Sequence, residues 1–278
     1  MERRLFGDGV RVSVLGCGCG RVGSINNTVP MKEIEATLDA AIEAGVNLFD
    51  TADIYAQGDS ERTVARVLRR HRERMFVVTK VGGRHSRYAG AIRFAKPLLR
   101  LMARSRADFR DAVVKARAAT VEYNFRPKDL GLAVDASRRR LRVDQLDGLL
   151  LHSPSIGTLR DPKVHDFLAD LVSSGRARYV GASVKSLPEV EAALSVSTLT
   201  MLQVPVAVAN MLPGSGVIEH IRQRHIAVFV REILEGVRLG TYSPREAISR
   251  AIAPDFVTSV IVGLSTRRHL NDSLAALA

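Results

Sequence analysis

Four polar residues of types that can move a proton stand at or just beyond the ends of apolar runs: Asp50, Tyr55, Lys80 and His152. A free tyrosine has a pKa of about 10, which is too high for an ideal proton donor at neutral pH. A nearby ammonium group favours the phenolate and lowers that pKa. A Tyr, a Lys, an Asp and a His brought together would therefore suit a site that protonates a developing alkoxide.

Each of the four residues would have its own task in such a site. Lys80 would lower the pKa of Tyr55, and Asp50 would fix Lys80 through an ion pair. His152 would orient a substrate oxygen or share the proton. Taken singly, a strand-end Asp is more often a turn former, a Lys a solvated charge and a His a structural residue. The prediction therefore depends on the elements that bring the four together.

Short β-branched or leucine-rich runs alternate with amphipathic segments along the chain. The runs predict strands at residues 14–17, 46–50, 75–80, 146–152, 178–183, 200–204, 226–231 and 258–263. Helices are expected at residues 30–43, from 59 onward, and at 127–141, 162–172, 187–194, 216–224, 244–252 and 267–277. The acids Asp59 and Glu61 are expected only to open the second helix, at the positive end of its dipole.

This alternation of strands and helices predicts the fold. Eight strand–helix units favour a closed (β/α)8 TIM barrel, with an open doubly wound sheet as the alternative. In a barrel, the carboxyl ends of all the strands meet at one rim, where active sites lie. The four polar residues would then face one another across the mouth of the barrel.

Two further segments accompany the predicted barrel. Residues 3–16 are typical of a hairpin around a Gly-Asp-Gly turn, which would cover the closed end of the barrel. After the third strand, residues 81–126 form a long basic insertion, with helical stretches expected at 93–104 and 108–121. The insertion would lie on the active-site side, or else present a solvated charged face or a subunit interface. We expect residues 1–278 to form one barrel domain.

The chain has a formal net charge of +12, and most of the excess is in the insertion. Such a balance attracts phosphates, whether of nucleic acid, an anionic membrane or a dinucleotide. The sequence has no zinc-finger spacing and no aromatic-rich RNA-binding signature, so nucleic acid is not expected as a partner. No apolar run approaches the ~20 residues that span a bilayer, and the first residues lack the apolar core of a secretory signal. We therefore expect a cytoplasmic protein that binds neither nucleic acid nor membranes.

Two local patterns point to other cofactors, but their context does not favour them. Cys17 and Cys19 cannot complete a tetrahedral zinc site, so we expect two buried thiols and no metal. Gly18, Gly20 and Gly23 match the G-x-G-x-x-G pattern of Rossmann folds, which requires a helix that starts within the pattern. The next predicted helix begins too late in the chain. The glycines would instead let the backbone approach a ligand closely at the barrel mouth.

The sequence resembles the aldo-keto reductase superfamily over nearly its whole length. The resemblance is carried by 45-GVNLFDTADIYAQGDSE-61, 79-TKVG-82, 138-RRRLRVDQLDGLLLHSP-154, 174-SGRARYVGAS-183 and 261-IVGLSTRRHL-270. It implies a (β/α)8 barrel above an N-terminal hairpin, and the NADP(H)-dependent interconversion of carbonyls and alcohols. It also implies that Asp50, Tyr55, Lys80 and His152 form the catalytic tetrad, with Tyr55 as the proton donor.

The resemblance further implies which residues hold the cofactor, NADPH or alternatively NADH. Ser183 and Gln203 match the positions that bind the nicotinamide carboxamide, whereas Val184 stands where the family has Asn. Arg231 matches a residue that stacks on the nicotinamide. The other predicted cofactor-binding residues are Gly18, Cys19 and Gly20 at the barrel mouth, and Gly263, Ser265, Thr266, Arg268 and Asp272 near the adenosine phosphate. Glu232 occupies the loop that normally meets the pyrophosphate.

The function that follows is reduction of an aldehyde or ketone to an alcohol, with NADPH delivering a hydride and Tyr55 protonating the oxygen. The small carbonyl substrate would be anionic if Arg84, Arg87 and Arg93 of the insertion line the site. The alternative is a cofactor-sensing or partner-binding protein on the same barrel, with weak or no turnover. Potassium-channel β-subunits are similar family members of that kind.

Overall fold

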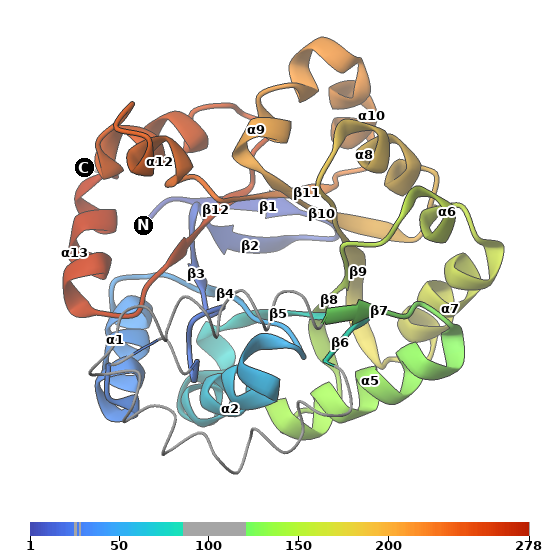
Figure 1. The fold of residues 1–278 in the computed structure, drawn as a ribbon, viewed down its shortest axis with the longest axis horizontal. Coiled ribbons are helices and arrows are strands. Elements are labelled where there is room, and N and C mark those ends of the chain that lie inside the picture. Colours follow the sequence, from blue (N-terminus) through green and yellow to red (C-terminus); the bar gives the residue numbers. More distant parts are fainter. Residues whose placement is uncertain (25–26, 28, 86–120, 278) are drawn as a thin grey trace.

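The computed structural model is a closed barrel of eight parallel strands, and it describes residues 1–24, 27, 29–85 and 121–277. Around the barrel the strands follow chain order: β3 (Leu15–Gly18), β4 (Leu48–Asp50), β5 (Phe76–Val81), β8 (Leu146–His152), β9 (Ala177–Ser183), β10 (Leu199–Pro205), β11 (Ala227–Arg231) and β12 (Ser259–Gly263). Pairing of Gly263 with Gly18 joins β12 to β3 and closes the ring. The predicted TIM barrel is confirmed (Figure 1), and the open doubly wound sheet is wrong.

Helices surround the barrel and cover its outer surface (Figure 1). In the described residues they are α1 (Met31–Glu43), α2 (Asp59–His71), α5 (Pro127–Leu141), α6 (Ile156–Leu159), α7 (Pro162–Ser173), α8 (Leu187–Leu194), α9 (Val206–Ala209), α10 (Val217–Gln223), α11 (Glu235–Arg238), α12 (Pro244–Ile252) and α13 (Arg267–Ala275), with 3-10 turns η1 (Tyr55–Gly58), η2 (Arg72–Arg74) and η3 (Leu212–Ser215). In α1, Ile34, Leu38 and Ile42 recur on one face and are buried. Gly45 follows this helix with a φ of +93°, a conformation that favours glycine.

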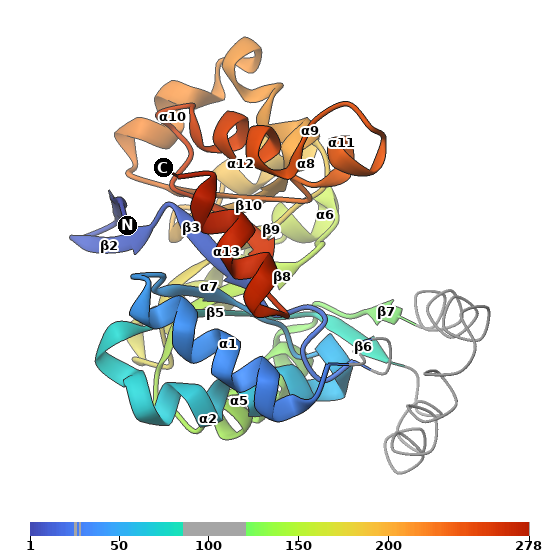
Figure 2. The same ribbon diagram turned by 90° about the vertical axis from the view of Figure 1, so that its left-hand side faces the viewer.

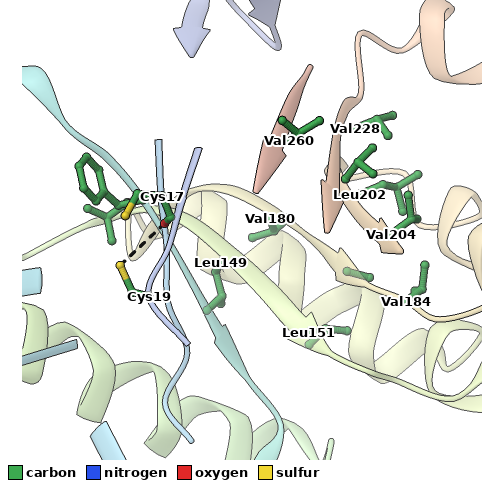
Figure 3. Packing of buried hydrophobic residues seen from close by; sticks show 14 of the residues in the cluster. Cys17, Cys19, Leu149, Leu151, Val180, Val184, Leu202, Val204, Val228 and Val260 are labelled. Atoms are coloured by element: carbon green, nitrogen blue, oxygen red, sulfur yellow. Dashed lines mark hydrogen bonds between the residues drawn. The ribbon is translucent and has the colours of Figure 1, made fainter. Parts of the chain in front are cut away.

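Alternate residues of the strands belong to two buried clusters. Leu149 and Leu151 of β8 join the helices in the larger cluster, part of which Figure 3 shows, whereas Leu150 joins the smaller cluster inside the barrel. Val180 and Leu202 of the next two strands also lie in the larger cluster (Figure 3). Because the strands are buried on both faces, their sequences are apolar throughout rather than alternating.

The N-terminal hairpin closes one end of the barrel. It consists of β1 (Arg3–Phe6) and β2 (Val10–Ser13), which pair antiparallel as predicted. Phe6 lies edge-on to Phe76 at a ring-centroid distance of 5.6 Å and to Tyr179 at 5.1 Å. Since Phe76 is the first residue of its strand, the hairpin covers the end opposite the strand carboxyl ends.

A short antiparallel ribbon, β6 (Gly83–His85) and β7 (Val121–Tyr123), stands at the two ends of the predicted insertion. Figure 2 shows this ribbon at the end of the barrel opposite the hairpin. The helix predicted at 93–104 lies outside the described residues, as does most of the helix predicted at 108–121. The predicted end of that second helix is wrong, because Val121 pairs its backbone with β6 instead.

Three further observations on the described residues bear on the sequence predictions. Cys17 and Cys19 are free, buried thiols, as predicted. Within the described ranges, no group of three or more His, Cys, Asp or Glu side chains is placed to share a metal ion. No helix in this part of the chain has the length and apolarity to cross a membrane.

Candidate active site

Asp50, Tyr55 and Lys80 meet at the carboxyl-terminal mouth of the barrel. β4 and β5 are parallel neighbours with Asp50 opposite Val78. Lys80 follows Val78 by two residues in β5, so its side chain lies on the same face of the sheet as Asp50. The Lys80 ammonium donates to Asp50 Oδ2 over 2.8 Å and lies 3.3 Å from the Tyr55 hydroxyl oxygen. It also donates to the Thr51 carbonyl over 2.9 Å. Lys80 is 1% exposed, so the predicted ion pair with Asp50 is present and shielded from water.

His152 joins these residues from β8, the strand next to β5. Its ring lies 5.8 Å from the Tyr55 ring and nearly perpendicular to it, at 89°. Its Nδ1 is buried without a hydrogen-bond partner among the described residues. Burial, together with the cations Lys80, Arg231 and Lys185, lowers the pKa of His152 to about 3. The imidazole is therefore neutral at physiological pH and can donate a hydrogen bond from a ring N–H.

Tyr55 keeps its proton at neutral pH. Burial raises the pKa of Tyr55 above its usual value, and the nearby Lys80 offsets this only in part. Lys80 thus lowers the pKa of Tyr55 as predicted, but the net shift is upward, because loss of hydration disfavours the phenolate more than one paired ammonium favours it. Burial also disfavours the Lys80 ammonium, but Asp50 and Tyr55 outweigh this and raise the pKa of Lys80. A neutral phenol thus lies beside a charged amine.

The turn that carries Tyr55 has an unusual backbone. Ala56, Gln57 and Gly58 follow it with φ angles of 51°, 60° and 81°, in the left-handed region that non-glycine residues rarely adopt. Such strain persists where the surrounding structure holds it, and it is frequent at functional sites. Here the turn lets α2 begin at Asp59, four residues after Tyr55, while the Tyr55 hydroxyl stays next to Lys80.

Glu61 supports the site in a way that the sequence did not predict. It lies in the first turn of α2 as expected, but its side chain is fully buried. It pairs with Arg140 of α5 and accepts a hydrogen bond from Thr79 Oγ1 over 2.7 Å. Thr79 precedes Lys80 in β5, so this buried ion pair anchors the strand that presents the amine. No signal in the sequence distinguishes Glu61 from a solvated acid at a helix start.

A cavity of about 400 Å³ lies at the mouth, and Asp50, Tyr55 and His152 line it. The predicted cofactor-binding residues that also line this tetrad cavity are Gly18, Gly20, Ser183, Gln203, Arg231 and Gly263. Ser183 Oγ donates to Gln203 Oε1 over 2.9 Å, and Gln203 Nε2 donates to Asp50 Oδ1 over 2.8 Å. The pair predicted to hold the nicotinamide carboxamide is therefore hydrogen-bonded to the tetrad itself.

A second cavity of about 480 Å³ lies beside the first. The residues that line both cavities are Gly18, Arg21, Glu232 and Gly263. Among the residues predicted near the adenosine phosphate, Ser265 and Asp272 line this second cavity. Thr266 does not, because its side chain caps α13, and the Arg268 side chain is 88% exposed, 3.7 Å from Asp272. The two cavities together form an elongated site that runs from the tetrad to α13.

Two positions of the predicted cofactor site face the core instead. The Cys19 side chain is fully buried and its Sγ lies 3.8 Å from the Cys17 carbonyl, so a side-chain contact with the cofactor does not fit the structure. The Cys19 backbone N–H donates to the Asp50 carbonyl over 2.8 Å, which ties β3 to the tetrad. Val184 is also fully buried and packs in the larger cluster (Figure 3). The position where the family has Asn therefore contributes to the core.

Arg231 and Glu232 form an ion pair at the boundary between the two cavities. Arg231 also donates to the Val184 carbonyl over 3.0 Å. Glu232 has a φ of 62°, a strained conformation for a residue with a side chain. A carboxylate thus stands where the resemblance predicts the pyrophosphate, and it is neutralised by its neighbour.

Five other residues that line the tetrad cavity were not predicted: Arg21, Tyr123, Ser153, Lys185 and Ile261. Lys185 stands two residues beyond Ser183, so its place just after a strand was the one signal available. Tyr123 belongs to β7, and nothing local in the sequence predicted that strand. Its position depends on pairing between two segments on either side of the insertion.

Comparison with known proteins agrees with this geometry. The model of the Aldo/keto reductase family matches residues 14–251. Versiconal hemiacetal acetate reductase of Aspergillus parasiticus is 31% identical over 193 residues, which cover 66% of this chain and 51% of that protein. The chain spans about half the length of the curated relatives it matches.

Solved structures share the whole fold. An aldo-keto reductase from Bacillus halodurans, in its holo form, has a TM-score of 0.75 at 21% identity, covering 100% of this chain and 91% of that one. An aldo-keto reductase from Klebsiella pneumoniae, in complex with NADPH, has a TM-score of 0.67 at 20% identity, covering 100% and 90% of the two chains. These likenesses concern the fold, whereas the family model concerns the sequence over most of the chain. On that match, the chain belongs to the aldo/keto reductase family.

Proposed function

We propose that this protein is an NADP(H)-dependent oxidoreductase that reduces an aldehyde or ketone to an alcohol. The observation that carries the proposal is the Tyr55 hydroxyl, 3.3 Å from the buried Lys80 ammonium, in a cavity that His152 also lines. This arrangement suits proton transfer to a carbonyl oxygen. The reductase from Aspergillus parasiticus and the NADPH complex of the enzyme from Klebsiella pneumoniae support the reaction and the cofactor.

The elongated site fits a dinucleotide in shape and in most of its polar groups. Ser183 and Gln203 would bind the nicotinamide carboxamide at the tetrad end, and Ser265 would bind at the adenosine end. Between them, no heavy atom of the described residues, apart from Gly263 itself and its chain neighbours, lies within 4 Å of the place where a Cβ of Gly263 would stand, so a ligand can pass close to the backbone. Arg21 and Arg231 favour a diphosphate at this boundary.

The chain's own residues would guide the proton. NADPH, when bound, supplies the hydride. Tyr55 donates its proton to the carbonyl oxygen as negative charge develops there. Lys80 stabilises the resulting phenolate, and Asp50 keeps Lys80 charged and in place. Neutral His152 donates a hydrogen bond to the same oxygen and orients the carbonyl, and each of these interactions is strengthened because little water screens it.

Consumption of NADPH with a panel of aldehydes and ketones tests the proposal. We expect carbonyl-dependent oxidation of NADPH, and a larger rise in melting temperature with NADPH than with NADH. By mass action, a ligand at 100 times its dissociation constant stabilises the fold by about 2.7 kcal/mol. Binding of NADPH without turnover of any carbonyl would instead favour the cofactor-sensing alternative. Absence of both binding and turnover would refute the choice of NADPH.

A further inference from the structure

The tetrad cavity carries an excess of positive charge. Of the two acids that line it, Asp50 pairs with Lys80, and Glu232 pairs with Arg231. Two further cations, Arg21 and Lys185, line the cavity, and neither forms an ion pair with another described residue. An anionic group on a ligand would therefore find two uncompensated partners there.

The positions of these two cations distinguish their tasks. Arg21 lines both cavities and so lies at the boundary, where the diphosphate of a dinucleotide would cross. Lys185 lines the tetrad cavity but is absent from the lining of the adenosine end. It shares this cavity with Tyr55 and His152, the residues proposed to act on the carbonyl. Lys185 is thus placed to meet the substrate rather than the cofactor's phosphates.

Neighbouring groups hold Lys185 in this place. Its backbone N–H donates to Glu189 Oε2 over 2.6 Å, which ties the end of β9 to the capped start of α8. Its Nζ lies over the Tyr123 ring, 5.6 Å from the centroid. The Tyr123 ring in turn lies edge-on to His152, with 6.4 Å between centroids. The ammonium of this exposed lysine therefore lies on the ring that also contacts His152, the residue proposed to orient the carbonyl.

The Tyr123 ring beneath Lys185 is held in place by its own neighbours. Tyr123 stacks on Phe125, with 6.3 Å between centroids and an angle of 6° between planes. Phe125 packs so closely on Gly82 that a Cβ there would lie 2.3 Å from its ring, and Gly82 has a φ of 107°. Only glycine is accommodated at that position without a shift. Tyr123 and Phe125 therefore form a well-packed pair of rings at the mouth of the barrel, next to the β6–β7 ribbon.

We propose that Lys185, held against Tyr123, binds a carboxylate on the substrate, and that the preferred substrates are aldehydes or ketones that carry such a group. The inference rests on the proposed reductase function. Burial is the main cause of the lowered pKa of His152 and Lys185 is the weakest of the three cations that add to it, so the ring stays neutral without this lysine. A carboxylate bound there would make a charge-assisted hydrogen bond of the kind that fixes ligand orientation.

Paired substrates test this inference: para-carboxybenzaldehyde and its methyl ester, which differ mainly in charge. The wild-type protein should show a higher kcat/KM for the acid than for the ester. Lys185→Met should reduce that preference about 10-fold through the KM of the acid, leaving the ester and the KM of NADPH unchanged. Lys185→Arg should retain the preference. Lys163→Met, at an exposed lysine of α7, is the matched control and should behave as the wild type.

The other outcomes are also decisive. A Lys185→Met variant with a raised KM for NADPH and equal losses on both substrates would assign Lys185 to the cofactor and overturn the inference. An unchanged preference would overturn it as well. If the wild type reduces neither substrate, the proposed reductase function fails for aromatic aldehydes. In that case, calorimetric titration with benzoate and benzamide tests the anion site alone. Binding of benzoate that is lost in Lys185→Met supports the site, and no selectivity for benzoate over benzamide in the wild type refutes it.

Discussion

The Lys80 ammonium lies 3.3 Å from the Tyr55 hydroxyl oxygen, in a place where Lys80 is 1% exposed. Because water screens these groups so little, the charge of one strongly affects the proton affinity of the other. The amine is held charged by Asp50, and the phenol retains its proton. The site is thus prepared to release a proton only when an acceptor oxygen gains negative charge next to Tyr55.

Replacement of the amine should affect both turnover and folding. Lys80→Met removes the charge that stabilises the phenolate, so we expect kcat to fall at least about 100-fold. It also leaves the Asp50 carboxylate buried without its cation, and breaking a buried ion pair costs about 3–5 kcal/mol. Urea unfolding should show the loss of stability, and Asp50→Asn added to Lys80→Met should recover part of it. A single variant as stable as the wild type would contradict the buried ion pair.

The dependence of activity on pH should lack an inflection from histidine. The pKa of His152 is lowered to about 3, so the ring stays neutral over the usual assay range. Burial raises the pKa of Tyr55 above its usual value, so the proton donor persists over the same range. We therefore expect kcat/KM for reduction to be flat between about pH 5 and 9. An inflection near the ordinary histidine value that vanishes in His152→Gln would contradict a neutral, buried imidazole.

The folded state should lose stability in acid because of His152. In the unfolded chain His152 has an ordinary pKa of about 6.5, whereas in the fold its pKa is about 3. Between these values the unfolded state binds a proton that the folded state does not, so stability falls as the pH drops through this window. His152→Gln should lose less stability than the wild type between about pH 6.5 and 4 in urea titrations. Parallel curves for the two proteins would be the contrary result.

Removal of the carboxylate at the cavity boundary should improve cofactor binding. Glu232→Gln frees Arg231 from its ion pair and removes a negative charge from the proposed diphosphate position. We expect the Kd for NADPH to fall about 5-fold, with a larger effect at low ionic strength. Fluorescence titration measures this, and Glu219→Gln on α10 serves as a control for the change in net charge. Weaker binding by Glu232→Gln alone would show that the carboxylate helps to hold the cofactor.

The barrel and the tetrad were predictable because each depends on a local pattern. The eight apolar runs appear as strands, and Asp50, Lys80 and His152 stand at strand ends, where the topology of a parallel barrel makes them neighbours. Tyr55 was predictable because it lies in the loop just after Asp50, the first of these strand ends. The residues that depend on pairing between distant segments were not predictable. Tyr123 reaches the mouth because β7 pairs with β6 across the insertion.

The surroundings of the buried ionisable groups could not be predicted from the sequence either. Glu61 is buried because Arg140 of α5 packs against it and pairs with it. In the sequence, an acid in the first turn of a helix has the same pattern whether it is solvated or buried. The sign of the Tyr55 shift depends on how completely the site excludes water, a property of the folded mouth as a whole. Val184 illustrates the reverse case, in which a position expected at the ligand is used by the core.

Turnover and cofactor binding by Tyr55→Phe test the central claim most directly. The phenylalanine keeps the ring in place and removes the proton donor. Tyr242→Phe, at a tyrosine that lines neither cavity, is the matched control. The proposed mechanism predicts that Tyr55→Phe binds NADPH with a Kd within about 2-fold of the wild type while kcat falls at least about 100-fold, and that Tyr242→Phe retains both. Wild-type turnover by Tyr55→Phe would contradict the assignment of Tyr55 as the proton donor.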